Sequence, residues 1–268
     1  MVSVLNKVLI YQFIAKNSFR QRFAYRSGVW VQIFSGIFFV FIQGSLWTAL
    51  IKSSYTDITL HEMISFVIIN SLVTYITFFN EANLIGSRVR DGSIATDMIL
   101  PVSFKWRVFS ENFGCNLFDL FFAGTPALMI ALLFYGAATP VSLSAFALFL
   151  PSLLLGILLS YQIKYLFSLT AFWIINPWYI SFLTSGLTKL FGGAVVPLWF
   201  YPVWLSDASS FFPFRFITYE PIQIYLGRVR GMNAAKSILM QTAWLVILFL
   251  LEQLIWSKAS KKVFVQGG

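Results

Sequence analysis

Charged residues are scarce in this sequence of 268 residues. Asp, Glu, Lys and Arg make up only 11% of it, against 58% hydrophobic and 19% aromatic residues. A soluble domain ordinarily carries about 25% charged residues. This composition excludes an ordinary soluble protein and indicates a polytopic membrane protein, whose short loops are too small to build a core of their own.

Cysteine and histidine are nearly absent, since Cys115 and His61 are the single examples of each. This excludes a metal cluster of Cys and His ligands, and it excludes an intrachain disulfide. The motif G-x-x-x-x-G-K followed by Ser or Thr is also missing, so the chain has no usual loop for nucleotide phosphates. We therefore expect no metal and no cofactor on this chain.

An enzymatic role has little support. His61, Asp57 and Ser53 have the residue types of a hydrolytic triad, but all three lie on one short loop. No glycine turn that could hold an oxyanion accompanies them. We expect no catalytic residue, and Cys115 is most simply a small packing residue inside an apolar stretch.

Long apolar stretches dominate the rest of the sequence. A helix needs about 20 apolar residues to cross the hydrocarbon core of a bilayer. Six stretches approach or exceed this length: residues 28–51, 63–84, 108–135, 143–167, 178–196 and 237–256. The predicted fold class is an all-α polytopic membrane protein with six transmembrane helices.

Residues 1–26 precede the first apolar stretch and contain five basic residues. Three of their apolar residues recur at a spacing of four: Leu5, Leu9 and Phe13. Ile10 and Ile14 fall outside this stripe. The segment lacks the unbroken apolar region and the cleavage site of a signal peptide. It is predicted to be an interfacial helix whose basic groups reach lipid phosphates.

The longest polar internal segment is residues 85–107, and it contains four basic residues: Arg88, Arg90, Lys105 and Arg107. Basic loops stay on the cytoplasmic side of a membrane, so this segment is predicted to be a cytoplasmic loop. Asp91 and Ser93 are suitable N-caps for one helical turn. The turn would run from Ile94 to Ile99, and Pro101 would end it. We expect a short helix across the membrane face.

Basic residues outnumber acidic ones by 19 to 10, which gives a net charge of +9. They flank the apolar stretches, so membrane topology explains them better than nucleic-acid binding does. Six spans put both termini on one side, which carries twelve bases against five on the other. The positive-inside rule then places both termini in the cytoplasm.

Residues 197–236 are rich in aromatic residues and hold four of the nine prolines. The segment is too apolar for a free loop and too broken for a span. Irregular backbone at membrane depth is tolerated only where protein or a wet cavity covers it. We predict an extracytoplasmic re-entrant segment of short helices that dip into the outer leaflet.

Three stretches resemble the permease subunit of a type-two ATP-binding cassette (ABC) exporter: RVRDGSIATDMILPVSFKWRVF, GGAVVPLWFYPVWLSDASSFFPF and PIQIYLGR. The first has the arginine, glycine and aspartate of such loops, followed by an apolar pair, a proline and an aromatic residue. The second has small residues, then Pro-Leu, then a second proline and Trp-Leu. With the order of spans and the basic N-terminal helix, the resemblance covers nearly the whole chain.

The resemblance implies a single transmembrane permease domain over residues 1–268, in the cytoplasmic (inner or plasma) membrane. Two permeases, identical or homologous, would pair in the membrane with two copies of an ABC ATPase, which bind ATP and Mg²⁺. Each permease would dock its ATPase through the N-terminal helix and the loop between the second and third spans.

The expected ATPase-coupling residues lie in that loop: Arg90, Asp91, Ile94, Asp97, Met98 and Ile99. Arg90 and Asp97 are expected to make polar contacts with the ATPase. The three apolar residues would pack into a groove on its surface.

Six charged residues fall within the predicted spans: Glu81, Glu111, Asp119, Lys164, Lys189 and Glu252. Charges are costly in lipid and usually face protein or water, although those near a span end can snorkel or pair. The alternative function is therefore an ion-coupled secondary transporter that uses Asp119, Lys164 and Glu252. The sequence has no internal repeat, which counts against it.

A translocation path would use deep charges and the aromatic residues of the re-entrant segment: Asp119, Lys164, Trp199, Trp204, Phe211 and Phe212. The aromatic residues also suit a belt that anchors this segment in the membrane. An aromatic and aliphatic lining is compatible with drugs, lipids, peptides or glycans, so the residues leave the substrate class open.

Overall fold

The computed structural model describes residues 4–24, 26–53, 58–136, 138–174 and 178–262. These residues are mostly helical and contain no strand, which confirms the all-α fold. Five helical stretches among them are long and apolar enough to cross a membrane: Gly28–Ile51, Leu60–Thr77, Phe104–Tyr135, Leu143–Phe172 and Gly231–Lys262. Each overlaps a predicted span, and the chain is a polytopic membrane protein.

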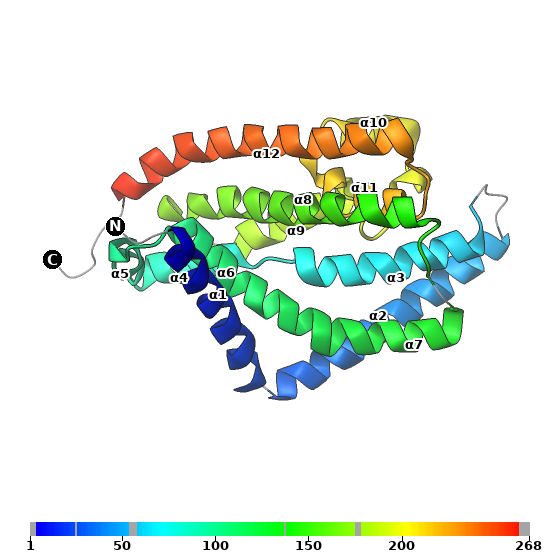
Figure 1. The fold of residues 1–268 in the computed structure, drawn as a ribbon, viewed down its shortest axis with the longest axis horizontal. Helices are drawn as coiled ribbons and strands as arrows, with labels where there is room; N and C mark the ends of the chain where they lie inside the picture. The colour runs from blue at the N-terminus through cyan, green and yellow to red at the C-terminus, as the bar shows by residue number, and fades with distance from the viewer. Residues whose placement is uncertain (1–3, 25, 54–57, 137, 175–177, 263–268) are drawn as a thin grey trace.

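Helix α8 lies at the centre of the bundle (Figure 1). The helices packed around α8 (Leu143–Ser168) are α3 (Leu60–Thr77), α4 (Glu81–Arg90), α9 (Trp178–Phe191), α11 (Tyr219–Tyr225) and α12 (Gly231–Ala259). The second half of α8 is buried on every side. A helix without a polar face to solvent belongs in the core, and α8 connects the outer helices to one another.

Helices α1 (Val4–Gln21) and α2 (Arg26–Ser53) form a V on one side of the bundle (Figure 1). α1 packs along α6 (Phe104–Asp119), whereas α2 packs on α3 and on α7 (Thr125–Tyr135). The start of α1, the end of α12 and the polar turns between α3 and α6 all lie at the same end of the molecule.

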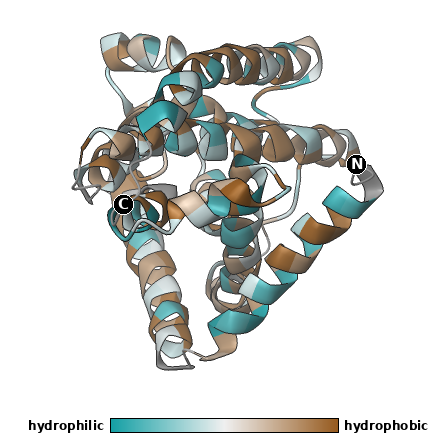
Figure 2. Cartoon of the chain, turned by 90° about the vertical axis from the view of Figure 1, so that its left-hand side faces the viewer, coloured by the Kyte–Doolittle hydropathy of each residue, from teal (hydrophilic) through white to brown (hydrophobic). Residues whose placement is uncertain are grey.

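α1 is amphipathic, and hydrophilic and hydrophobic residues alternate along it (Figure 2). Leu9 and Phe13 of the predicted apolar stripe are exposed, whereas Ile10 and Ile14 are partly buried. The side chain of Leu5 lies outside the described residues. The two isoleucines leave the stripe because they face the chain rather than the surroundings.

The second predicted span is wrong at its end, because α3 stops at Thr77 and a separate helix, α4 (Glu81–Arg90), follows. Phe78 has extended backbone, with φ of −82° and ψ of 106°. The segment predicted as a loop from residue 85 onward therefore begins inside α4. It continues through α5 (Ile94–Ile99), the predicted single turn, into the first turn of α6.

The third predicted span is continuously helical but begins at Phe104 rather than at residue 108. Between α6 and α7 it contains a π-helical turn, Leu120–Gly124. Pro126 has no N–H, and its ring crowds the carbonyl of Phe122 four residues earlier. A wider turn relieves this crowding, and it re-aims the residues directly after Asp119.

The fifth predicted span, residues 178–196, also ends early. α9 has 14 residues, which extend about 21 Å against a hydrocarbon core about 30 Å thick. Gly193 stands just past its end with φ of +64°. This left-handed conformation suits glycine and terminates a helix. α9 is not among the five stretches that meet the length criterion.

Residues 197–230 form the expected short helices, namely η4 (Leu198–Phe200), α10 (Val203–Ser210), η5 (Pro213–Phe216) and α11. α12 begins at Gly231 and includes the last residues that were assigned to this segment. All seven residues of α11 are buried. The α11 part of this segment is thus covered by protein, whereas α10 lies at the surface.

A buried polar network joins α6, α8 and α12. Lys105 Nζ forms an ion pair with Glu252 and donates to Gln162 Oε1 at 2.7 Å. Gln162 Nε2 donates to Glu252 Oε2 at 2.7 Å. The Tyr161 hydroxyl donates to the carbonyl of Lys105. The start of α6 is therefore fixed to the end of α12 through one turn of α8.

The close approach of α1 to α6 depends on Gly114. A Cβ added there would lie 2.1 Å from the carbonyl oxygen of Ala15. We expect Gly114→Ala to destabilise the docking of α1 by about 1–3 kcal/mol, because the helices must separate. Thermal unfolding in detergent micelles checks this. Gly28→Ala is the matched control, since a Cβ at Gly28 meets nothing within 4 Å. Equal melting temperatures for the two variants would contradict the prediction.

The ion pair of the buried network gives a second expected outcome. Glu252→Ala leaves the buried Lys105 without its counter-ion and should cost about 3–5 kcal/mol of unfolding free energy. Removing both charges, as Lys105→Met with Glu252→Leu, should recover most of that loss. Thermal unfolding of the single and double variants measures the difference. A double variant no more stable than Glu252→Ala would show that the charge pair is not the cause.

Candidate functional site

The turn between α4 and α6 is built around α5, which has six residues. The N–H of Ser93 donates to Asp91 Oδ1 at 2.9 Å. Hydrogen bonds from Ser93 hold the pKa of Asp91 below its usual value. The predicted side-chain caps on α5 itself are not formed. Leu100 is extended, as expected before Pro101, and the helix ends at Ile99.

Four charged residues fix α5 to its neighbours: Arg88 of α4, Asp97 of α5, and Arg107 and Glu111 of α6. Asp97 pairs with Arg88 at 2.9 Å and with Arg107 at 2.5 Å. Glu111 pairs with the same two arginines, at 2.6 Å and 3.2 Å. The alternation of signs closes a ring of four ion pairs, so α4, α5 and α6 are held as one unit.

The predicted coupling residues divide into two groups. Ile94 is 2% exposed, and Asp97 is buried inside the ring of ion pairs. Both face the interior of the chain, so neither is free to touch a partner. Met98 is partly buried against the same core. The remaining three, Arg90, Asp91 and Ile99, are exposed, and Ile99 is 83% exposed.

The break between α3 and α4 is satisfied by side chains from α6 and α8. Asn116 Nδ2 donates to the carbonyl of Ile76 at 3.2 Å. Ser160 Oγ donates to the carbonyl of Thr77 at 2.6 Å, and Lys164 Nζ to that of Phe79 at 3.1 Å. A cation at a helix C-terminus is also favoured by the helix dipole. Lys164 therefore caps the end of α3.

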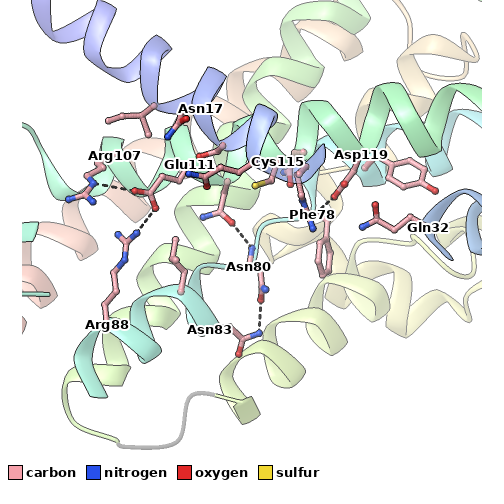
Figure 3. Close-up of a pocket in the computed structure, with 18 of the residues that line it drawn as sticks. Asn17, Gln32, Phe78, Asn80, Asn83, Arg88, Arg107, Glu111, Cys115 and Asp119 are labelled. Atoms are coloured by element: carbon pink, nitrogen blue, oxygen red, sulfur yellow. Dashed lines mark hydrogen bonds and ion pairs between the residues drawn. The ribbon is translucent and has the colours of Figure 1, made fainter. Parts of the chain in front are cut away.

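A cavity of about 1020 Å³ lies between α1, α2, α3, α4 and α6 (Figure 3). Arg22 Nη2 and Asp119 Oδ2 pair across it at 3.0 Å. Gln32 of α2 faces Asp119 from the other side (Figure 3). The polar residues that line the cavity are Asn17, Ser18, Gln21, Arg22, Gln32, Thr74, Tyr75, Asn80, Asn83, Arg88, Arg107, Glu111, Asn112, Cys115, Asn116 and Asp119.

A second cavity of about 510 Å³ adjoins the first, and the two share Gln32, Thr74, Tyr75 and Phe78 in their linings. It extends along α2, α3 and α9, and its lining is mostly apolar. Lys164 and Lys189 also line it. The two cavities together form a groove that follows α3 from its middle to the start of α4.

The predicted path residues do not all meet at this groove. Asp119 lines the first cavity and Lys164 the second. Trp199 packs against Phe66 at a ring distance of 5.0 Å. Trp204, Phe211 and Phe212 are exposed at the surface and line neither cavity. They suit the second interpretation of this segment, a belt of rings at its surface.

One polar face of α6 escaped notice in the sequence. Glu111, Asn112, Cys115, Asn116 and Asp119 follow one another at helical spacing and all line the first cavity. Polar residues three or four apart in an apolar stretch share one helix face, so the sequence could have predicted this polar face. No local pattern predicts that Arg22 and Gln32 join it, because only the V formed by α1 and α2 brings them there.

Other candidate chemistry finds no support in the described part of the chain. No group of three or more His, Cys, Asp or Glu that could hold a metal occurs there. His61 is exposed. Its supposed partner Asp57, like the side chains of Ser53 and Glu81, lies outside the described residues.

Comparison with known proteins gives one match. The family model described as "ABC-2 family transporter protein" matches residues 52–267. No curated protein and no solved structure matches the chain. The match covers most of the sequence, from the end of α2 through α12, including the α4–α6 unit and the α3, α4 and α6 walls of the groove. The chain therefore belongs to the ABC-2 family of transporter proteins.

Proposed function

We propose that this chain is the membrane-spanning permease subunit of an ATP-driven exporter. It pairs with a second, identical or homologous permease, and two copies of a separate ATPase bind ATP and Mg²⁺ for the complex. The observation that carries the proposal is the α4–α6 unit, which is held by four ion pairs and presents an exposed apolar tip. Exposed apolar surface outside the membrane favours a protein partner.

The tip consists of Ile99 and Leu100 at the end of α5, and Arg90 and Asp91 are exposed at the end of α4. A partner that pushes on α5 would move α4 and α6 with it, because breaking the buried pairs of Asp97 is costly. The two helices reach the break after α3 and the large cavity. A movement of the tip would therefore reach the groove through a rigid unit, without a flexible linker between them.

Charge supports an orientation with the α5 end and both termini in the cytoplasm. Two of the bases assigned to the outer side are neutralised within the chain. Arg215 pairs with Glu220 at 2.7 Å, and Arg228 pairs with Glu62 at 3.2 Å. On the α5 side Arg22, Arg88, Lys105 and Arg107 are also paired within the chain. Pairing therefore reduces the charge on both sides, and the α5 side keeps the larger number of bases, as the positive-inside rule requires.

The three residues of the ion-coupled alternative all bind other groups within the chain. Asp119 pairs with Arg22, and Glu252 with Lys105. Lys164 binds the carbonyl of Phe79. These contacts account for each of the three charges within the fold, so a transported ion is not needed to explain them.

The apolar tip gives a direct test of ATPase binding. We expect Ile99→Asp to weaken binding of the ATPase by about 2 kcal/mol, roughly thirtyfold, because it places a charge in an apolar contact. The measurement is the ratio of ATPase to tagged permease after co-expression with the ABC ATPase encoded nearest to it and purification through the tag. Leu143→Asp is the control, since Leu143 is also 83% exposed but begins α8 at the opposite end. An unchanged ratio for Ile99→Asp would refute the contact.

Orientation can be tested with two single cysteines in a Cys115→Ala background. Asp207 of α10 and Thr96 of α5 are both exposed. A cysteine at position 207 should react with a membrane-impermeant maleimide in intact cells. A cysteine at position 96 should react only after the cells are permeabilised. The reverse pattern would overturn the orientation.

A further inference from the structure

The groove along α3 changes character along its length. The section at the α4 end, lined by residues from Thr74 to Arg88, is rich in amide and hydroxyl side chains. The section from Asn70 toward Val195 of the segment after α9 exposes mostly apolar surface, although Lys164 and Lys189 also line it. Their volumes, about 1020 Å³ and 510 Å³, suit small amphipathic ligands.

Charges in the polar section are balanced among themselves. Arg22 pairs with Asp119 at 3.0 Å. Arg88 and Arg107 share Glu111, and Asp97 behind them completes the ring. A fully charged ligand would have to break one of these buried pairs, which costs several kcal/mol. The section therefore favours a head group without net charge.

Amides supply the remaining polar surface of this section. Asn17 and Gln32 approach from the two arms of the V, and Asn83 approaches from α4 (Figure 3). Each amide both donates and accepts hydrogen bonds, which is the pairing that a hydroxyl group needs. Tyr75 and Phe78 offer ring faces at the boundary with the apolar section.

We propose that this groove binds an amphiphile with an uncharged, hydroxyl-bearing head group and a hydrocarbon chain. The head lies in the polar section, and the chain lies along α2, against Val31 and Phe39, in the apolar section. The inference rests on the proposed function, which places the α5 end in the cytoplasm. The polar section lies at that end, so the head group lies at the inner surface of the membrane, as the head group of an inner-leaflet amphiphile does. It names the substrate class of the exporter.

Cys115 makes the proposal testable without a new label. It is the single cysteine of the chain, it lines the polar section, and it is partly exposed. The full chain in phosphatidylcholine nanodiscs, with and without its ATPase, is treated with N-ethylmaleimide, and alkylation is followed by intact mass. Octyl β-glucoside below its micelle concentration should slow alkylation at least fivefold and saturably. Glucose, octyl sulfate and octyltrimethylammonium should slow it less than twofold.

Two controls separate binding from general effects. In a Cys115→Ala, Thr96→Cys chain the reporter stands on α5, outside the groove, and octyl β-glucoside should not slow its alkylation. Asn17→Leu should reduce the protection of Cys115 at least threefold, whereas Asn233→Leu, at an exposed position of α12 away from the groove, should not. The rate without ligand shows whether each variant keeps the groove intact.

The outcomes distinguish this inference from the proposed function. Absence of protection, or equal protection by the charged amphiphiles, would overturn the substrate class. Co-purification of the ATPase in that case would leave the permease role standing. Protection of Cys115 in a chain that binds no ATPase would support the site and refute the ATP-driven exporter.

Discussion

The break between α3 and α4 is the constraint on which the rest of the structure depends. Backbone carbonyls released by a helix end at membrane depth must find donors inside the protein, because lipid supplies none. Ser160 and Lys164 of α8 bind two of these carbonyls, and Asn116 of α6 binds a third. The break frees α4 to leave the direction of α3 and to form the end of the molecule with α5. A continuous second span would have no α4–α6 unit, and the large cavity between α3, α4 and α6 would have no wall at that end.

The same turn of α8 also holds the two helices that flank this end. Gln162 lies between Ser160 and Lys164 and binds both members of the pair formed by Lys105 and Glu252. Ser160 and Lys164 are four residues apart and share the helix face that meets the end of α3, whereas Gln162 points to the other side, toward α6 and α12. One turn can therefore serve all three helices at once. This explains why polar residues are buried on every side of a helix that otherwise has the composition of a lipid-facing span. The polar contacts of this turn fix the relative positions of three helices that a purely apolar packing would leave free to slide.

Sequence patterns predicted the features that depend on local composition. Apolar length located the five long spans, and Pro101 marked the end of α5. The break after Thr77 escaped because Phe78 and Phe79 are apolar, so hydropathy continues through it while the backbone does not. The short α9 escaped for a similar reason, since Gly193 interrupts the helix without interrupting the apolar stretch. The burial of Asp97 depends on Arg88 and Arg107, which lie on other helices. Such a contact has no local signature, so an acidic residue in a polar loop was naturally assigned to the surface.

Charge pairing also decides how the intramembrane charges are to be interpreted. Isolated from their partners, Asp119, Glu252 and Lys164 suggest an ion pathway, because a lone charge in lipid needs a functional reason. In the folded chain each has a partner whose position the fold dictates. These ion pairs and the hydrogen bond offset the energetic cost of burying the three charges, so no transported ion is needed to explain them. In the first cavity the paired charges cancel, and the remaining polar lining consists mainly of amide and hydroxyl side chains. A pathway with that lining discriminates by hydrogen bonding rather than by charge, which suits a carrier driven by a separate ATPase better than one driven by the movement of protons.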